Sequence, residues 1–191
     1  FGFIGGVPSA TITKFEMGYI QGLKAIYPDA VVYDYYANDW GKPELAKAQS
    51  KNWFDGGVYA VFSAAGGTGG GTIAQAKEYR SQGKNVWAIG VDSDQSYLAP
   101  ETVITSAMKR VDNAVYATVE ALVNGTYAGG LSSFDIHNGG VDIAPTQDLL
   151  TEEVITAVED VKAKLEAGEI TVPATAEEFD AAYGADVYTL D

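Results

Sequence analysis

The stretch VYAVFSAAGGTGGGTIAQA, residues 58–76, decides the fold that we predict for this chain. Valine, tyrosine and phenylalanine lead into five glycines within the six positions 66–71, and a helical pattern over 69–82 follows. A strand that passes through a glycine loop into a helix is one half of a βαβ unit. Whether that loop holds a phosphate or approaches an uncharged group separates the functions open to the chain.

The same alternation of strand and helix continues on both sides of the loop. Several strand segments are nearly continuous apolar runs, which is typical of a parallel sheet covered by helices on both faces. We therefore predict an α/β fold, and we expect Thr13 and Glu16 to form a capping box at the start of the first helix. The predicted strands span 2–6, 30–36, 58–65 and 85–92, and the predicted helices span 13–26, 41–57 and 69–82.

After Asp92 the regular alternation ends. A polar stretch leads to a short predicted strand at 102–106 and a predicted helix at 108–124. One face of that helix is apolar, and if its partner sheet is missing from this chain we expect the face to meet either water or a neighbouring chain. The residues of this apolar stripe are Val111, Val115, Val119 and Leu122.

The two ends of the chain also carry information. The first residues, FGFIGG, already have the pattern of a strand, which suggests that sequence is missing upstream. Towards the other end, a helix is predicted from Thr151 to Gly168, with a capping residue at each end. Residues 172–191 form an acidic tail in which one short helix is expected at 175–183.

Composition excludes several classes of function. The formal net charge of −14 argues against a nucleic-acid partner, because that affinity depends on Lys and Arg neutralising phosphates. The absence of cysteine and the single histidine exclude thiolate and multi-histidine metal sites, and Asp92 with Asp94 is too small a set of ligands. We find no hydrolase motif. No catalytic residue, metal or cofactor is therefore expected.

The glycine loop has three interpretations. It contains no Lys or Arg, so it cannot hold phosphates as a Walker A loop does. Gly69, Gly71 and Ala74 match the spacing of a dinucleotide fingerprint, with Asp92 about twenty residues further on, so an NAD-dependent oxidoreductase stays an alternative. The glycines could also serve only a tight turn, or they could expose backbone N–H groups to a small polar ligand.

Three side chains near the loop are candidates for ligand contacts. Asp92 ends a predicted parallel strand, where α/β folds bind their ligands, and its carboxylate can accept hydrogen bonds from two neighbouring hydroxyls. It could equally cap the next segment. Phe62 could stack on a planar base or belong to the core. Lys109 and Arg110 are expected to begin a helix, an unfavourable place for cations, which indicates an acceptor partner or a solvated pair.

Several stretches together resemble the basic membrane protein (BMP) family of bacterial ABC transporter substrate-binding lipoproteins. Its best-known members are purine nucleoside receptors, and the resemblance runs from residue 1 to about 172. The resemblance implies the type I periplasmic-binding-protein fold, in which two α/β lobes enclose the ligand. It also implies an extracytoplasmic, lipid-anchored protein that delivers its ligand to an ABC permease. The matching stretches are GFIGG (2–6), KFEMGYIQGLKA (14–25), VFSAAGGTGGG (61–71), AIGVDSDQSYLAP (88–100) and ITSAMKRVDNAVY (104–116).

The resemblance also implies roles for particular residues. Phe62 would stack on the base, Gly66 and Gly67 would contact the ligand through their backbone, and Asp92 and Lys109 would bind the sugar hydroxyls. The family's N-terminal lobe, with its lipidated cysteine, has no counterpart here. The glycine run is longer than usual, and the acidic tail has no equivalent.

These expectations divide the chain as follows. Residues 1–103 and 145–171 would form the C-terminal lobe, and 104–144 would be a crossover segment belonging to the absent lobe. We predict a non-enzymatic receptor for inosine, guanosine or adenosine, with a sugar receptor of the same fold as the alternative. Segment 104–144 would pair with the missing N-terminal lobe or form a homodimer.

Overall fold

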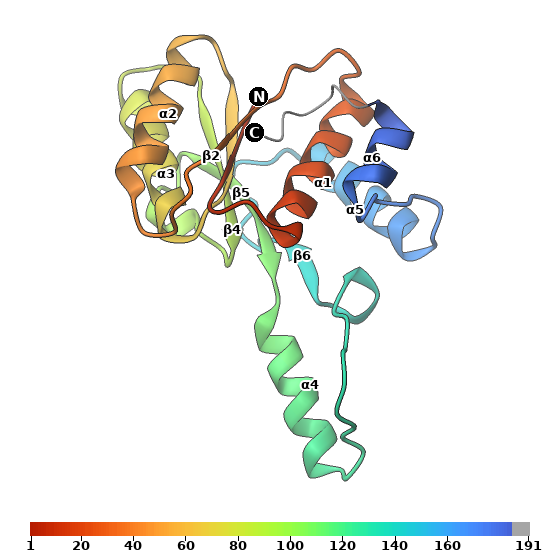
Figure 1. Cartoon of the computed structure of the whole chain (residues 1–191). Coiled ribbons are helices and arrows are strands. Elements are labelled where there is room, and N and C mark those ends of the chain that lie inside the picture. The colour runs from red at the N-terminus through yellow and green to blue at the C-terminus, as the bar shows by residue number, and fades with distance from the viewer. Residues whose placement is uncertain (185–191) are drawn as a thin grey trace.

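A computed structural model describes residues 1–184 and confirms the α/β fold (Figure 1). One six-stranded sheet has the order β2-β1-β3-β4-β5-β6. The first five strands are parallel, and β6 pairs with β5 in the antiparallel direction. The strands are β1 (Gly2–Gly5), β2 (Tyr33–Tyr36), β3 (Ala60–Ala64), β4 (Trp87–Asp92), β5 (Val103–Lys109) and β6 (Val141–Ile143).

Six helices connect or follow these strands. In Figure 1, α2 and α3 lie together on one side of the sheet, and α1 lies on the other side with α6 beside it. The predicted helices are present with ends shifted by a few residues, as is usual for boundaries taken from sequence. The helices are α1 (Ala10–Ile26), α2 (Pro43–Asp55), α3 (Gly70–Ser81), α4 (Val111–Val123), α5 (Glu152–Glu166) and α6 (Ala176–Tyr183).

Each face of the sheet has its own hydrophobic core. Ile4 and Val61 belong to the cluster that packs with residues of α2 and α3. Phe3 and Phe62, next to them in sequence, belong to the cluster under α1. This alternation follows from the two-residue period of a strand, and each fully buried apolar side chain contributes about 1.5–3 kcal/mol.

The contact between α2 and α3 depends on a glycine and on a small polar network. A Cβ atom added at Gly71 would lie 1.9 Å from the carbonyl oxygen of Pro43, so no larger residue fits there. The hydroxyls of Ser50 and Ser63 both donate to Oγ1 of Thr72, at 3.0 and 2.8 Å. All three side chains are buried, and the network satisfies them without leaving an orphaned hydroxyl.

The predicted capping box of α1 is wrong. Ser9 is the capping residue, and its hydroxyl accepts the N–H of Ile12 at 3.3 Å. Glu16 is instead fully buried, and its carboxyl accepts a hydrogen bond from the Tyr36 hydroxyl at 2.5 Å. Burial raises the pKa of Glu16 to about 7, against the lowering effect of that hydrogen bond. Because α1 begins at Ala10, three residues earlier than predicted, Glu16 lies inside the helix and faces the core.

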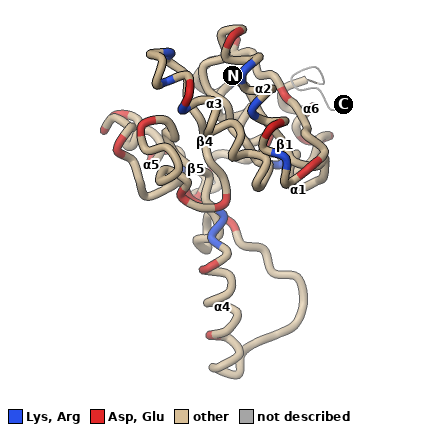
Figure 2. The backbone as a smooth tube through the Cα atoms, turned by 90° about the vertical axis from the view of Figure 1, so that its left-hand side faces the viewer, with Lys and Arg blue, Asp and Glu red and all other residues tan. Residues whose placement is uncertain are grey.

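Residues 110–140 form an arm that projects from the sheet (Figures 1 and 2). It consists of α4, a long return segment and a short 3₁₀ turn at Ile136–Asn138. No residue of α4 is buried, and the whole predicted apolar stripe on it is exposed. Lys109 ends β5 and Arg110 precedes α4, so the expectation that both begin a helix is wrong. The sheet therefore includes strands at both ends of the predicted crossover segment 104–144.

The C-terminal region packs on α1. The predicted short helix is confirmed as α6, and Thr175 caps it by accepting the N–H of Glu178 at 3.2 Å. Phe179 is fully buried in a small cluster with Met17 and Ile20 of α1. The part of the acidic tail from 172 to 184 is thus attached to the fold, and 185–191 lie outside the described residues.

Candidate functional site

A cavity of about 280 Å³ opens where β3, β4 and β5 end, close to the start of α1. The carboxyl ends of parallel strands are the usual ligand-binding edge of an α/β sheet. Three of the five predicted site residues line this cavity, namely Gly66, Asp92 and Lys109. The complete lining consists of Ser9, Thr11, Ile12, Phe15, Trp40, Ala64, Gly66, Val91, Asp92 and Lys109.

Asp92 and Lys109 form an ion pair at the rim of this cavity. The Asp92 carboxylate lies 2.8 Å from the Lys109 ammonium, and each side chain is about half exposed. Their positions follow from sheet register, because Asp92 pairs with Met108 and Lys109 is the next residue of β5. The pair therefore presents an acceptor and a donor side by side, and both remain accessible to a ligand.

The backbone of Asp92 has an unusual conformation. Its φ of 66° lies in the left-handed region, which residues with a Cβ atom adopt at a cost of roughly 1–2 kcal/mol. Backbone strain of this kind is concentrated at functional sites, where surrounding structure holds it in place. Here the side-chain oxygen of Gln95 accepts the N–H of Val91 at 3.0 Å and fixes the turn that follows β4.

The glycine loop forms a short 3₁₀ turn, Gly66–Gly69, directly before α3. Gly66 has a φ of 56° and lines the cavity. Gly67 does not line the cavity. A Cβ atom added at Gly67 would lie 3.1 Å from the carbonyl oxygen of Trp40. Gly69 packs on Ser63 in the same way, at 3.2 Å. Gly71 packs closely against α2, as described above. Close internal packing therefore explains both glycines of the dinucleotide-like pattern, Gly69 and Gly71.

Phe62 is not available to a ligand. It is only 4% exposed, because the alternation along β3 directs its ring towards α1. Its ring centroid lies 5.7, 6.2 and 5.4 Å from those of Phe3, Phe15 and Tyr19. The prediction that Phe62 presents a stacking face disagrees with this burial, and its alternative as a core aromatic agrees with it.

Two aromatic residues that we did not predict line the cavity, Phe15 and Trp40. Phe15 belongs to the apolar face of α1, so its pattern in the sequence indicates only core. Trp40 lies in the polar turn between β2 and α2 and is 46% exposed. A large aromatic residue within such a turn is a signal that could have found it, because turn positions are otherwise polar.

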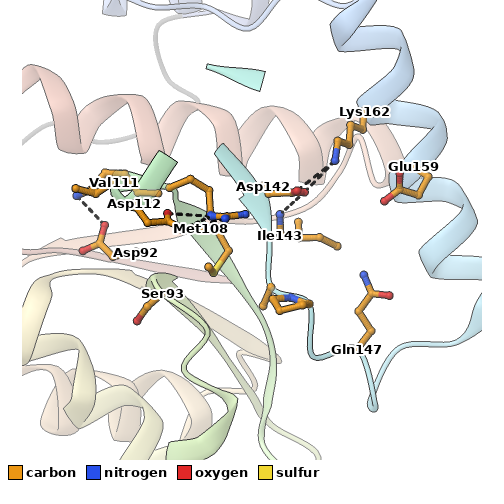
Figure 3. Close-up of a pocket in the computed structure, with 14 residues that line it drawn as sticks. Asp92, Ser93, Met108, Val111, Asp112, Asp142, Ile143, Gln147, Glu159 and Lys162 are labelled. Carbon is orange, nitrogen blue, oxygen red and sulfur yellow. Dashed lines mark hydrogen bonds and ion pairs between the residues drawn. The ribbon is translucent and has the colours of Figure 1, made fainter. Parts of the chain in front are cut away.

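A larger cavity of about 700 Å³ lies beside β6 and α5, and it shares Asp92 and Lys109 with the first (Figure 3). Six of its seven charged side chains form ion pairs with one another, and Glu159 is the seventh. The carboxylate of Asp142 on β6 accepts from the ammonium of Lys162 on α5 at 3.2 Å, and Arg110 pairs with Asp112 at 2.8 Å. This cavity therefore offers fewer free charges to a ligand than its size suggests.

Among residues 1–184, no three His, Asp or Glu side chains lie together as a metal site would require. Asp94 instead accepts the N–H and the hydroxyl of Ser96, at 3.0 and 2.6 Å, and the N–H of Thr146 at 3.3 Å. These hydrogen bonds lower the pKa of Asp94 against the effect of its desolvation, and they give it a structural role. Within the same range, no helix is both long and apolar enough to cross a membrane.

Comparison with known proteins agrees with this arrangement. A family model described as "ABC transporter substrate-binding protein PnrA-like" matches residues 1–176. The "CD4+ T-cell-stimulating antigen" of Listeria innocua is 35% identical over 184 residues, which are 90% of this chain and 52% of that protein. The "ABC transporter nucleoside-binding protein BmpA" of Lactococcus lactis is 34% identical over 185 residues, 90% of this chain and 52% of that protein. The chain thus spans about half the length of these relatives.

Solved structures share the fold. A solute-binding protein of an ABC transporter system from Aeropyrum pernix superposes with a TM-score of 0.81 at 23% identity, over 97% of this chain and 62% of that one. A protein from Bacillus halodurans described as a transcriptional activator of the comK gene gives a TM-score of 0.77 at 21% identity, over 88% and 56%. At such identities the likeness concerns the fold alone.

Proposed function

The chain belongs to the family of PnrA-like ABC transporter substrate-binding proteins, and we propose that it forms one wall of a site for a purine nucleoside. The observation that carries this proposal is the accessible Asp92–Lys109 pair at the carboxyl edge of the sheet. A ribose presents two neighbouring hydroxyls. One can donate to the carboxylate while the other accepts from the ammonium, so a single sugar satisfies both groups.

An uncharged ligand fits the surroundings of the pair. The glycine loop has no cationic side chain, and the chain carries a formal charge of −14, so a phosphorylated ligand would meet repulsion. Backbone N–H groups and a neutral pair of opposite charges suit hydroxyl and carbonyl groups instead. A relative is named as nucleoside-binding, which supports the same ligand class. The ligand would be bound and released, with no chemical step.

The opposite wall would come from a second lobe, in the part of the relatives' length that this chain lacks. The body of the sheet would be the C-terminal lobe, and the crossover segment 104–144 would carry the arm into the other lobe. The exposed stripe of α4 supports this assignment, because an apolar helix face gains stability only when it is covered. Closure of two lobes over the ligand would present a defined surface to an ABC permease. The protein would be extracytoplasmic and lipid-anchored, as the family resemblance implies.

The test is an NMR titration of the chain with inosine, following backbone amide signals of Gly66, Asp92 and Lys109. The substitutions Asp92→Asn and Lys109→Met each remove one charge-assisted hydrogen bond, worth about 1.5–3 kcal/mol, or roughly tenfold to a hundredfold in Kd. Asn tolerates the left-handed backbone of position 92, so the Asp92→Asn variant should keep the fold.

A matched control is available on α5 and β6. Asp142 and Lys162 form a comparable ion pair that lines only the larger cavity. Asp142→Asn and Lys162→Met should therefore leave the inosine titration unchanged. If inosine moves no amide signal of the natural chain at millimolar concentration, the proposed site is wrong. Equal or tighter binding of D-ribose would favour the sugar receptor instead.

A further inference from the structure

We propose that Asn124, at the tip of the arm, is a site of spontaneous deamidation, while the fold protects the other Asn-Gly pair of the chain. The two places where glycine follows asparagine are Asn124–Gly125 and Asn138–Gly139. Asparagine is chemically labile, most of all before glycine, which has no side chain to hinder approach to its backbone nitrogen. One pair lies at the tip of the arm, just after α4, and the other at its base (Figure 1).

The reaction uses only the chain and water. The backbone nitrogen of the glycine gives up its proton and attacks the side-chain carbonyl carbon of the asparagine. A C–N bond forms and closes a five-membered succinimide, and the side-chain nitrogen takes up the proton and leaves as ammonia. Water then opens the succinimide at either carbonyl, which gives aspartate or isoaspartate with one new negative charge. Nothing is oxidised or reduced, so the rate depends on how readily the nitrogen and the carbonyl carbon meet.

The backbone is similar at the two sites. Asn124 follows the last residue of α4, and Asn138 ends the 3₁₀ turn at the base of the arm. The glycines that follow them have left-handed φ angles of 68° and 69°. Each attacking N–H donates to the carbonyl three residues earlier, at 3.2 Å for Gly125 and 3.5 Å for Gly139. Backbone hydrogen bonds therefore give Asn124 no advantage over Asn138.

The two asparagine side chains differ in their hydrogen bonds. At Asn138 the side-chain oxygen accepts the N–H of Asp135 at 2.8 Å, and the side-chain nitrogen donates to the carbonyl of Ser133 at 2.9 Å. Both bonds must break before this side chain can turn towards Gly139. The Asn124 side chain has no hydrogen-bond partner among residues 1–184. Both residues are exposed, so access of water does not separate them.

The surroundings of the two glycines increase this difference. The carbonyl of Gly139 accepts a hydrogen bond from Nδ2 of Asn113 at 2.8 Å, and a Cβ atom added at Gly139 would lie 3.2 Å from the same nitrogen. A Cβ atom added at Gly125 would have no atom within 4 Å beyond its chain neighbours. The turn at Asn138 can therefore rotate only if the base of the arm opens. At Asn124 only the last turn of α4 has to fray, which costs little free energy.

Deamidation at Asn124 changes the end of α4. The new carboxylate lies at the negative end of the helix dipole, where it is unfavourable. It also lies two residues from Leu122, which belongs to the exposed apolar stripe. Isoaspartate, in addition, lengthens the backbone by one carbon atom. The arm thus acquires a slow, irreversible change of charge beside the face that is free to contact a partner.

The test is incubation of the folded chain at mildly alkaline pH, followed by digestion with endoproteinase Asp-N and mass spectrometry. Cleavage before aspartate places Asn124 in peptide 112–134 and Asn138 in peptide 135–141. We expect Asn124 to convert from amide to acid roughly tenfold to a hundredfold faster than Asn138, which must first lose two hydrogen bonds. The product at position 124 should be a mixture of aspartate and isoaspartate, which chromatography separates.

The same chain unfolded in urea is the matched control, because both pairs then lack the fold and should react at similar rates. Gly125→Ala should slow conversion of Asn124 and leave that of Asn138 unchanged. If Asn138 reacts as fast as Asn124 in the folded chain, the proposed protection is wrong. If Asn124 stays an amide for as long as both pairs take to react in urea, the end of α4 protects it and the proposed site is wrong. An equal ratio of the two rates in urea and in the folded chain would mean that local sequence, and not the fold, sets the difference.

Discussion

Helices α3 and α4 follow parallel strands of the same sheet, yet α3 is largely buried and α4 is exposed. The sequence of α3, GGTIAQAKEYRS, is largely polar or small, and six of its residues are buried against α2 and the sheet. The sequence of α4, VDNAVYATVEALV, is far more apolar, and none of its residues is buried. The more apolar helix is the exposed one. Apolar content therefore indicates that a helix has a partner, but it does not say where in the protein that partner lies.

The same contrast separates the body of the sheet from the arm at residues 110–140. The body buries even some polar groups, including the carboxyl of Glu16, because helices pack on both faces of its sheet. The arm exposes valine, leucine and tyrosine. At its base its own two ends are joined, because the N–H of Arg110 donates to the carbonyl of Gly140 at 2.9 Å and the side chain of Asn113 donates to the carbonyl of Gly139 at 2.8 Å. We expect substitutions to have large effects on stability in the body and small effects in the arm.

The largest effect is expected at Gly71, where the body is packed most tightly. Gly71→Ala places a Cβ atom against the backbone of α2 and should lower the free energy of unfolding by roughly 3 kcal/mol or more. A Cβ atom added at the neighbouring Gly70 would have no atom within 4 Å beyond its own helix backbone and chain neighbours. Gly70→Ala should therefore raise the free energy of unfolding by about 0.5–1 kcal/mol, because alanine restricts the unfolded chain. Urea unfolding of the two variants measures the difference, and equal stabilities would contradict the observed packing of α2 on α3.

The second effect depends on pH and concerns Glu16. Its pKa in the folded state, about 7, lies above the ordinary value of 4.5, so the folded state binds the proton more tightly. The contribution of this group to the free energy of unfolding should therefore be largest below pH 4.5 and should fall by about 3 kcal/mol as pH rises through 7. Glu16→Gln keeps an acceptor for the Tyr36 hydroxyl and removes the charge.

We expect Glu16→Gln to match the natural chain near pH 4.5 and to be more stable than it near pH 8. Chemical unfolding at the two pH values measures this difference. Glu120→Gln, on the exposed α4, is the control and should follow the natural chain at both values. If the free energy of unfolding of Glu16→Gln changes with pH as steeply as that of the natural chain, the Glu16 carboxyl is not the source of the pH dependence.

The sequence predicted the body of this protein well and its site only in part. Alternating strands and helices required only local patterns, and the parallel direction of the strands followed from the βαβ units that they form. The position of Asp92 at the carboxyl edge could be predicted because it ends a predicted strand. Lys109 was expected to begin a helix, and only the family resemblance indicated its place at the site. The orientation of Phe62 could not, since a shift of one residue along β3 moves the ring to the other face. Trp40 was missed because it lies in a polar turn, and only the packing of the turn between β2 and α2 brings it to the cavity.

A third and smaller effect is expected at Asp92, where the body meets the arm. Asp92→Gly and Asp92→Ala both remove the ion pair with Lys109, which is worth at most ~1 kcal/mol between side chains so exposed. Only glycine adopts the left-handed backbone freely, so Asp92→Gly should be more stable than Asp92→Ala by about 1 kcal/mol. Thermal unfolding of the two variants measures the cost of the left-handed backbone alone, because both variants lack the carboxylate. Equal stabilities would mean that position 92 relaxes to an ordinary conformation.

The smallest effect on stability is expected in the arm, and it is the most direct test of the contrast between the arm and the body. Val115→Ser with Val119→Ser changes two exposed side chains of α4, so the free energy of unfolding should stay within ~0.5 kcal/mol of the natural value. Val61→Ser, on the fully buried β3, is the control in the body and should cost roughly 2 kcal/mol or more. All three tryptophans lie outside the arm, so their fluorescence reports unfolding of the body alone.

The same arm variant should change association. An uncovered apolar stripe drives contact with a second copy when its own partner is absent, and light scattering of the natural chain should therefore show a mass above that of a monomer. The double serine variant should lower that mass towards 20.2 kDa without altering the unfolding curve. A natural chain that stays monomeric, with an arm variant as unstable as Val61→Ser, would mean that α4 folds back onto the body in solution. The stripe would then have its partner within this chain, and no second lobe would be needed to cover it.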